Sequence, residues 1–98
     1  MPYFCYILEC ADGTFYTGWS TDPLRRLRQH NRGTGARYTR TRRPLRLVYV
    51  EPQPDRITAM RRERTLKNRT HIQKSHLIQQ YRNEQETSSA DIPSAGGV

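Results

Sequence analysis

Two short segments of strand-like composition, separated by Asp12-Gly13, constrain the fold of this chain most strongly. Residues 3–10 and 14–20 are rich in aromatic and β-branched side chains, which favour strands. An Asp-Gly pair between two such segments is typical of a hairpin turn. The chain is therefore expected to begin with a β-hairpin.

The length of the hairpin loop decides whether Tyr6 and Tyr16 share a face of the sheet. Side chains alternate along a strand, and residues opposite each other in an antiparallel pair share a face. A two-residue turn would place Tyr16 opposite Glu9, and the two tyrosines would project from opposite faces. A three-residue loop, with Gly13 in the left-handed conformation of a bulge, would place Tyr16 opposite Leu8 and on the same face as Tyr6. The residues alone permit both registers.

Turn and capping signals divide the rest of the chain into one further strand and three helices. Pro23 and the preceding cap residues begin a helix that Gly33 ends, and a basic segment without useful periodicity follows. The order ββαβαα predicts an α+β domain over residues 1–82, with a three-stranded antiparallel sheet flanked by three helices. The expected later elements are a basic loop at 33–44, a strand at 45–51, helices at 55–67 and 70–82, and a disordered, polar tail at 83–98.

Positive charge is concentrated in the middle of the chain. The sequence contains 17 Lys and Arg against 9 Asp and Glu, for a net charge of +8, and 15 of the 17 are arginine. Residues 1–20 contain no Lys or Arg, whereas residues 21–50 contain nine arginines. Arginine suits phosphate oxygens, and each phosphate contact releases counterions. The pattern therefore favours a nucleic-acid partner over a merely soluble surface.

Length and composition also limit the class of protein. A chain of 98 residues with 34% hydrophobic residues is one domain with a modest core. The sequence shows neither a secretion signal nor a membrane-spanning segment. Cys5 and Cys10 lie in one predicted strand and form no zinc-binding spacing with the histidines, so we interpret them as reduced residues. These features predict a cytoplasmic protein with no membrane partner.

Three polar residues on the predicted helices are candidates for chemistry. Arg26 and His30 are four residues apart, so they share one face of the first helix at the edge of the core. Arg26 is also explained as part of a basic surface, and His30 as a histidine favoured by the helix C-terminus. Glu63 lies on the apolar side of the next helix, where it either pairs with Lys67 or binds a hard cation such as Mg²⁺. The residues leave these alternatives open.

Three segments together resemble the GIY-YIG nuclease superfamily, and within it the small stand-alone bacterial proteins related to the N-terminal nuclease domain of the excinuclease ABC system. The segments are YILECADGTFYTGWSTDPLRRLRQHN, GTGARYT and AMRRERTLK, and the resemblance covers roughly residues 3–80. Tyr16-Thr17-Gly18 corresponds to the second motif of the family name, with Thr17 where the name has isoleucine. Phe4-Cys5-Tyr6 retains only the tyrosine of the first.

The resemblance implies a catalytic set formed by Tyr6, Tyr16, Arg26, His30 and Glu63. Tyr16, with Tyr6 nearby, would position or deprotonate the attacking water, and Arg26 would stabilise charge on the phosphate. His30 would assist proton transfer, and Glu63 would hold one Mg²⁺ or Mn²⁺ ion near the leaving oxygen. The implied activity is a metal-dependent endonuclease acting on DNA.

The expected nucleic-acid contacts come from the basic loop and the basic helices. Tyr38 lies among arginines and could stack on an unpaired base, which favours single-stranded or distorted DNA as the substrate, with RNA left open. The alternative is a non-catalytic nucleic-acid-binding protein, although such a protein does not need Glu63 on a basic helix. The residues expected to contact nucleic acid are Arg25, Arg37, Tyr38, Arg40, Arg42, Arg43, Arg62 and Lys67.

Overall fold

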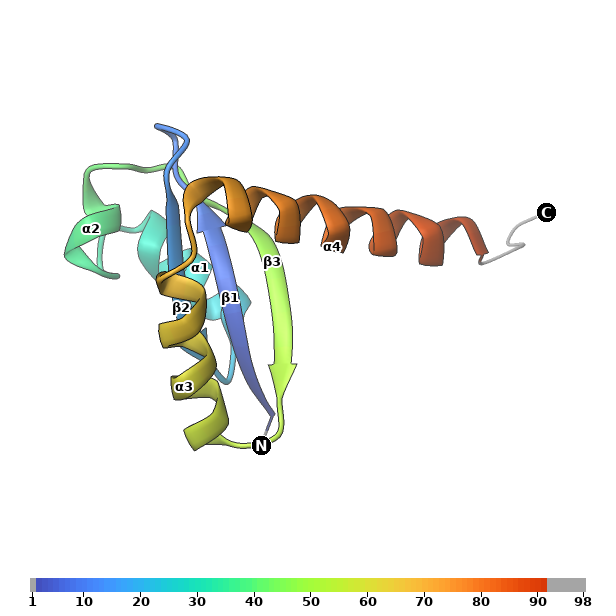
Figure 1. Cartoon of the computed structure of the whole chain (residues 1–98). Coiled ribbons are helices and arrows are strands. Elements are labelled where there is room, and N and C mark those ends of the chain that lie inside the picture. Colours follow the sequence, from blue (N-terminus) through green and yellow to red (C-terminus); the bar gives the residue numbers. More distant parts are fainter. Residues whose placement is uncertain (1, 92–98) are drawn as a thin grey trace.

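The protein folds as a three-stranded antiparallel sheet with helices on both faces (Figure 1). The computed structural model describes residues 2–91, with side chains described up to residue 86. The strand order is β2-β1-β3, which confirms the predicted α+β class and the ββαβαα order of the main elements. The strands are β1 (Tyr3–Glu9), β2 (Phe15–Ser20) and β3 (Arg46–Gln53). The helices are α1 (Pro23–Asn31), α2 (Arg37–Arg40), α3 (Arg56–Lys67) and α4 (His71–Asp91), of which the one-turn α2 lies in the segment expected to be a loop.

The hairpin adopts the three-residue loop. The Gly13 N–H donates to the Cys10 carbonyl at 2.9 Å, and the Cys10 N–H donates to the Thr14 carbonyl at 2.8 Å. Gly13 has a φ of 84°, a conformation that glycine adopts without steric cost. Leu8 therefore stands opposite Tyr16 and Tyr6 opposite Gly18, as this register predicts. The two tyrosines lie on the same face of the sheet.

The sheet separates two hydrophobic clusters. Because β1 is the central strand and is covered on both faces, the four residues from Cys5 to Leu8 are all buried. One face packs against α1, and the other packs against α3 and α4 (Figure 1). The α1 cluster contains Tyr6, Leu8, Cys10 and Leu45, and the opposite cluster contains Cys5, Ile7, Tyr49, Ala59, Leu66 and Ile78.

Specific hydrogen bonds fix α1 against the sheet. The Asp22 carboxylate caps the helix by accepting from the Arg25 N–H at 3.1 Å. At the other end, Asn31 Oδ1 accepts from the Leu45 N–H at 2.7 Å, and Asn31 Nδ2 donates to the Leu45 carbonyl at 2.9 Å. Helix α1 is thus joined to the start of β3, and this attachment sets the position of its polar side chains relative to the sheet.

Helix α4 is longer than predicted. It continues to Asp91, whereas the predicted helix ended at residue 82 and disorder was expected from residue 83. Residues 83–91 contain neither Gly nor Pro and include good helix formers, so the backbone continues as a helix that projects beyond the sheet (Figure 1). The predicted tail at 92–98 lies outside the described residues. Within residues 2–91 no helix has the length and apolar composition needed to cross a membrane.

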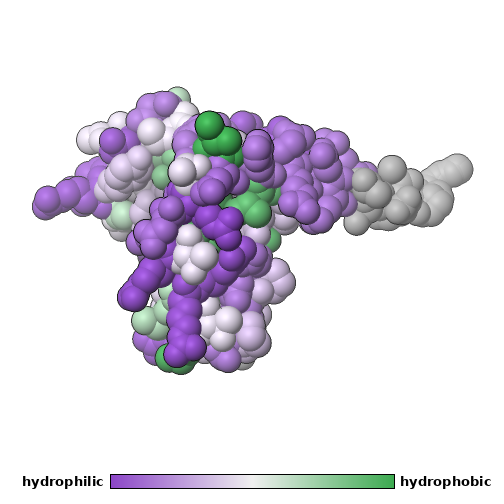
Figure 2. All heavy atoms as spheres, viewed as in Figure 1, coloured by the Kyte–Doolittle hydropathy of each residue, from purple (hydrophilic) through white to green (hydrophobic). Residues whose placement is uncertain are grey.

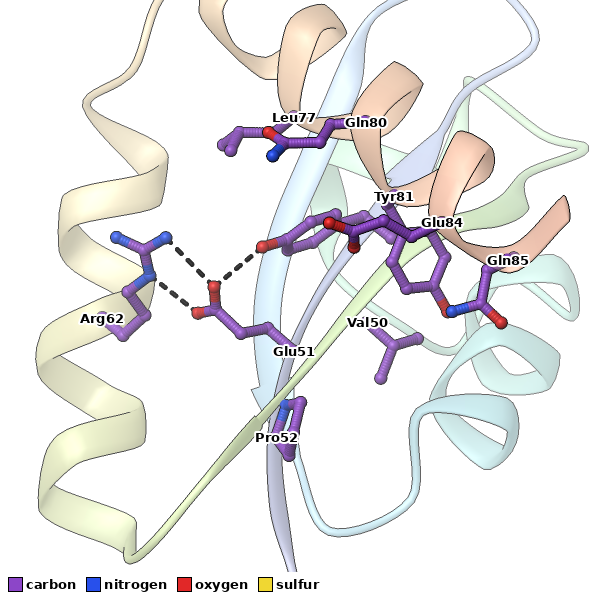
Figure 3. A pocket seen from close by; sticks show the side chains of 10 residues that line it. Val50, Glu51, Pro52, Arg62, Leu77, Gln80, Tyr81, Glu84 and Gln85 are labelled. Carbon is purple, nitrogen blue, oxygen red and sulfur yellow. Dashed lines mark hydrogen bonds and ion pairs between the residues drawn. The ribbon is translucent and has the colours of Figure 1, made fainter. Parts of the chain in front are cut away.

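A polar network joins β3 to α3 on the face away from α1 (Figure 3). Arg62 donates to both Glu51 oxygens, at 2.7 and 3.0 Å, and the Tyr49 hydroxyl donates to Glu51 at 2.7 Å. Burial acts to raise the pKa of Glu51, but its hydrogen bonds outweigh this effect and lower the pKa. Burial raises the pKa of Tyr49 to about 12. Arg62, which was expected to contact nucleic acid, is thus held by a carboxylate that attaches α3 to the sheet.

Replacement of Arg62 by alanine tests the structural role of this network. We expect Arg62→Ala to lower the free energy of unfolding by about 1–3 kcal/mol, because Glu51 would lose the partner that compensates its half-buried charge. Arg61→Ala is the matched control, since Arg61 is exposed on the same helix and its loss should change stability little. Urea denaturation of both variants measures the difference. Equal stabilities would contradict the structural role of Arg62.

Candidate active site

The Tyr6 side chain packs against Gly18 of the neighbouring strand. Tyr6 is only 1% exposed, and its side chain lies directly over Gly18 on the neighbouring strand. A Cβ atom at Gly18 would stand 2.6 Å from the Tyr6 hydroxyl oxygen and 2.7 Å from Cζ, which is too close for any other residue type. The glycine of the Tyr16-Thr17-Gly18 motif therefore provides the space in which the Tyr6 ring lies.

Tyr16 lies on the edge strand β2 and is half-buried among polar groups of α1. Its ring centroid is 4.8 Å from that of His30. Burial raises the pKa of both Tyr16 and Tyr6, Arg26 acts to lower both values, and Glu63 acts to raise both. The Arg26 and Glu63 charges therefore act on both hydroxyls. Both phenols are protonated at neutral pH.

His30 is completely buried at the end of α1, and one of its ring nitrogens is hydrogen-bonded within the protein. Its Nδ1 atom lies 2.8 Å from Thr39 Oγ1 and accepts from the Ala36 N–H at 3.4 Å. A backbone N–H can only donate, so we assign the proton of the neutral ring to Nε2. Nε2 is buried and has no hydrogen-bond partner in the described part of the chain. Burial lowers the pKa of His30, and Arg26 acts in the same direction.

The short helix α2 holds the His30 ring in this orientation. Thr39 is buried on α2, and with Nδ1 unprotonated its hydroxyl donates to Nδ1 at 2.8 Å. The same hydroxyl oxygen lies 2.9 Å from the Ala36 carbonyl oxygen. Gly35 lies against the ring, since a Cβ atom there would overlap the imidazole. An unpaired buried donor such as Nε2–H is costly and requires an explanation. A substrate oxygen or a water molecule in the site would provide its partner.

Arg26 and Glu63 bring opposite charges to the tyrosines from opposite layers of the fold. Arg26 is half-buried on α1, and its Nη1 donates to Gln29 Oε1 at 2.8 Å. The other guanidinium donors can bind phosphate oxygens. Glu63 is half-buried on α3, and among described residues its nearest basic partner is Lys67, at 3.9 Å. The ion pair that we considered for Glu63 is therefore present but long.

The candidate site offers a metal ion one carboxylate ligand and not a full set of protein ligands. Within residues 2–91, no group of three or more His, Cys, Asp or Glu side chains could hold a metal ion. Mg²⁺ and Mn²⁺ do not require such a cage, because phosphate and water oxygens supply most of their ligands in nucleotide sites. Glu63 accepts no hydrogen bond from the described residues, so its oxygens are available to a cation. The residues fit one such ion, with Glu63 as its protein ligand.

The residues expected to contact nucleic acid differ in how the protein uses them. Arg25, Arg37 and Arg40 are exposed. Figure 2 shows hydrophilic side chains covering most of one face of the molecule, over α3 and α4. Arg43 is also exposed, but its side chain donates to the Arg40 carbonyl at 2.9 Å. The structure thus leaves a basic surface around α1 and α2, whereas Arg62 lies in the network with Glu51.

Tyr38 presents an aromatic face beside the candidate site. It is 40% exposed, and its ring is stacked near that of Tyr16 with centroids 6.4 Å apart. The Arg42 guanidinium lies 3.9 Å from the Tyr38 ring centroid and also pairs with Asp12 at 3.0 Å. Arg42 thus supports the ring from one side and fixes it against the hairpin loop.

Lys74 lies beside the candidate site and was not predicted from the sequence. This residue lines a groove of about 320 Å³ together with Tyr16, Tyr38 and Lys67. Lys67 and Lys74 are the only lysines of the chain, and they come from the end of α3 and the start of α4. Their spacing of seven residues does not predict that they lie close together, because a turn between two helices separates them. No motif marks Lys74 in the sequence.

Comparison with known proteins shows the family of this chain. Residues 2–76 match the model of the GIY-YIG catalytic domain, and the chain belongs to this family of nucleases, which generally use divalent metal ions and act on DNA. A UPF0213 protein of Streptococcus agalactiae is 48% identical over 85 residues, covering 87% of this chain and 97% of the relative. A UPF0213 protein of Staphylococcus aureus is 44% identical over 78 residues, covering 80% and 95%.

Two structures determined by solution NMR are similar as well. The UPF0213 protein of Bacillus halodurans is 44% identical, with a TM-score of 0.52 over 81% of this chain and 84% of that one. A protein of E. faecalis is 39% identical, with a TM-score of 0.57 over 84% and 88%. The small GIY-YIG fold is therefore shared with these bacterial proteins.

The buried, neutral state of His30 predicts a pH dependence of stability. Its pKa in the folded protein is below the ordinary value of 6.5, so the unfolded chain takes up a proton at a pH at which the folded protein does not. The stabilisation is therefore fully present above pH 6.5 and is lost as the pH falls toward the pKa of the folded state. The loss has a limiting slope of about 1.4 kcal/mol per pH unit.

Urea unfolding of the wild type and His30→Gln at several pH values between about 8 and 5 measures this slope. The variant should be less stable at neutral pH, but the difference between the two proteins should shrink as the pH falls. His71 and His76 are present in both proteins and cancel in the comparison. A difference that stays constant with pH would show that His30 titrates normally.

Proposed function

We propose that this protein is a metal-dependent endonuclease that hydrolyses phosphodiester bonds in DNA. The observation that carries the proposal is the convergence of Tyr6, Tyr16, Arg26, His30 and Glu63 at the edge strand β2. A protein that only binds nucleic acid has no use for a half-buried carboxylate beside one buried and one half-buried phenol. It also has no use for a buried imidazole N–H without a partner.

Each side chain has a distinct task in this proposal. The Arg26 guanidinium binds the phosphate oxygens and stabilises the charge that develops on them. The oxygen of the Tyr16 hydroxyl orients the attacking water. Arg26 is the group of this chain that favours deprotonation of the Tyr16 hydroxyl. Tyr6, fixed over Gly18, holds the position of Arg26 and Tyr16. The neutral His30 ring donates a hydrogen bond from Nε2–H to an oxygen of the reacting phosphate or to Tyr16.

Glu63 is the residue that would hold the metal ion. One Mg²⁺ or Mn²⁺ ion bound there would supply positive charge for the phosphate and its leaving oxygen. Without a cation, the Glu63 charge acts to raise the pKa of both tyrosines. Glu63 is therefore unfavourable for phenol deprotonation by itself, which supports its assignment as a ligand and not as the base.

The surface around the site supports a substrate with accessible bases. Arg25, Arg37 and Arg40 provide positive charge without a base-reading element, so long target sequences are not expected to be recognised. The exposed Tyr38 ring could stack on an unpaired base of single-stranded or distorted DNA. RNA is the competing substrate. The free thiols of Cys5 and Cys10 support a reducing, cytoplasmic location.

Cleavage assays test this proposal directly. The wild type should cleave labelled DNA in the presence of Mg²⁺ or Mn²⁺ and should be inactive with EDTA. Single- and double-stranded forms of DNA and RNA are compared in the same assay. Glu63→Ala and Tyr16→Phe should each reduce the rate by about 10² to 10³, because each removes a group acting on the transition state.

Matched controls separate these effects from a contaminant. Glu84→Ala removes an exposed carboxylate of α4, and Tyr81→Phe removes a phenol that packs on Tyr49 at the opposite face. Both should cleave at the wild-type rate. Absence of cleavage by the folded wild type with every substrate and metal would disprove the proposed nuclease activity. Undiminished cleavage in both site variants would place the activity elsewhere.

A further inference from the structure

A groove adjoins the candidate active site and shares Tyr16 with it. Its volume is about 320 Å³, and its walls come from β2, α2, the end of α3 and the start of α4. Lys67 and Lys74 converge on it from the end of α3 and the start of α4. The residues that line the groove are Phe15, Tyr16, Thr17, Tyr38, Lys67 and Lys74.

The charges in this groove are unfavourable unless an anion is present. Lys74 lies in the first turn of α4, where the helix dipole disfavours a cation, and that turn contains no acidic residue. Burial lowers the pKa of Lys74, and the positive charge of Lys67, which lines the same groove, acts in the same direction. Among described residues, no carboxylate lies within ion-pair distance of Lys74. Two cations thus face one concave surface without compensation on the α4 side.

The start of α4 is fixed rigidly against the hairpin. The His71 ring stacks on Phe15 with centroids 4.5 Å apart, and His71 Nε2 donates to the Gly13 carbonyl at 3.0 Å. A capping box holds the first turn, because Thr70 and Gln73 exchange hydrogen bonds of 2.9 and 3.1 Å. The Lys74 backbone is therefore held in place, and the groove does not depend on a flexible loop.

We propose that Lys67 and Lys74 bind the DNA phosphate next to the one that is cleaved. The inference rests on the proposed nuclease function, because Tyr16 belongs to both the groove and the catalytic set. Lys67 stands between Glu63 and Lys74, so a strand whose scissile phosphate lies at Arg26 and Glu63 would place a neighbouring phosphate at the two lysines. The enzyme therefore requires a charged phosphate on one side of the scissile bond.

Thymidine oligonucleotides with one uncharged methylphosphonate test this requirement. The methylphosphonate is placed at the linkage before or after the cleaved bond. At one of the two positions, wild-type cleavage should fall about tenfold, as expected for the loss of a charge-assisted contact. Lys74→Ala should cleave the fully charged substrate about tenfold more slowly and should lose nothing further on the methylphosphonate substrate. This non-additivity is the signature of a direct contact.

Two variants control this experiment. Lys74→Arg keeps the charge and should retain most of the activity. Arg82→Ala removes a cation from an exposed position of the same helix and should behave as the wild type. Urea midpoints of all variants should agree with that of the wild type, which excludes unfolding as the cause of any loss. The phosphate site would be disproved if wild-type cleavage were insensitive to both methylphosphonates, or if the losses of rate in Lys74→Ala were additive. Neither result would contradict the nuclease function.

Binding without metal distinguishes failure of this site from failure of the nuclease. In EDTA, the affinity for a fluorescent oligothymidine should decrease with salt, and Lys74→Ala should reduce the slope of log K against log salt by about 0.7, which corresponds to one phosphate contact. A reduced slope in a protein that never cleaves would support the phosphate site and disprove the nuclease. An unchanged slope would contradict the phosphate site whatever the cleavage result.

Discussion

The left-handed conformation of Gly13 sets the register of the hairpin, and the geometry of the site depends on that register. A slip of one residue would turn every side chain of β2 to the other face of the sheet. Tyr16 would then leave α1, and the space above Gly18 that receives the Tyr6 ring would be lost. One backbone conformation in an exposed loop therefore places two phenols on a common face.

The second constraint is the position of β2 at the edge of a small sheet. Arg26 and His30 reach it from α1 on one face, whereas Glu63 reaches it from α3 on the other. An edge strand is the place where groups from both layers can meet without crossing the sheet. Among the described residues, no further strand pairs with the outer side of β2. This arrangement explains how so short a chain can bring these candidate residues together.

Local signals predicted most of the fold, and the failures have physical causes. Strand-like composition, the Asp12-Gly13 pair and the caps before Pro23 and Arg56 predicted the hairpin, the third strand and the start of the helices. The length of α4 could not be predicted from apolar periodicity, because its second half projects from the sheet and needs only helix propensity. Helix α2 is a single turn, too short to give a periodic signal, although it holds His30 through Thr39.

The candidate site was predictable only in part. Neighbouring charges could be paired by spacing, as for Glu63 and Lys67, but the partner of Arg62 lies eleven residues away on another element. Lys74 enters the site through the turn between two helices, which no residue pattern encodes. The resemblance to a family supplied the five-residue set. The structure adds the reason why those side chains meet and which cations are already used by the fold.

Paramagnetic broadening by Mn²⁺ tests the central claim that one metal ion binds at Glu63, beside the two tyrosines. In ¹H–¹⁵N spectra at low Mn²⁺ concentration, the amide signals of Glu63, Tyr16 and Arg26 should broaden first, while that of Arg82 stays sharp. Glu63→Gln should abolish this pattern while the remaining spectrum is preserved. Broadening that persists in Glu63→Gln, or that is centred on Glu51, would contradict the account.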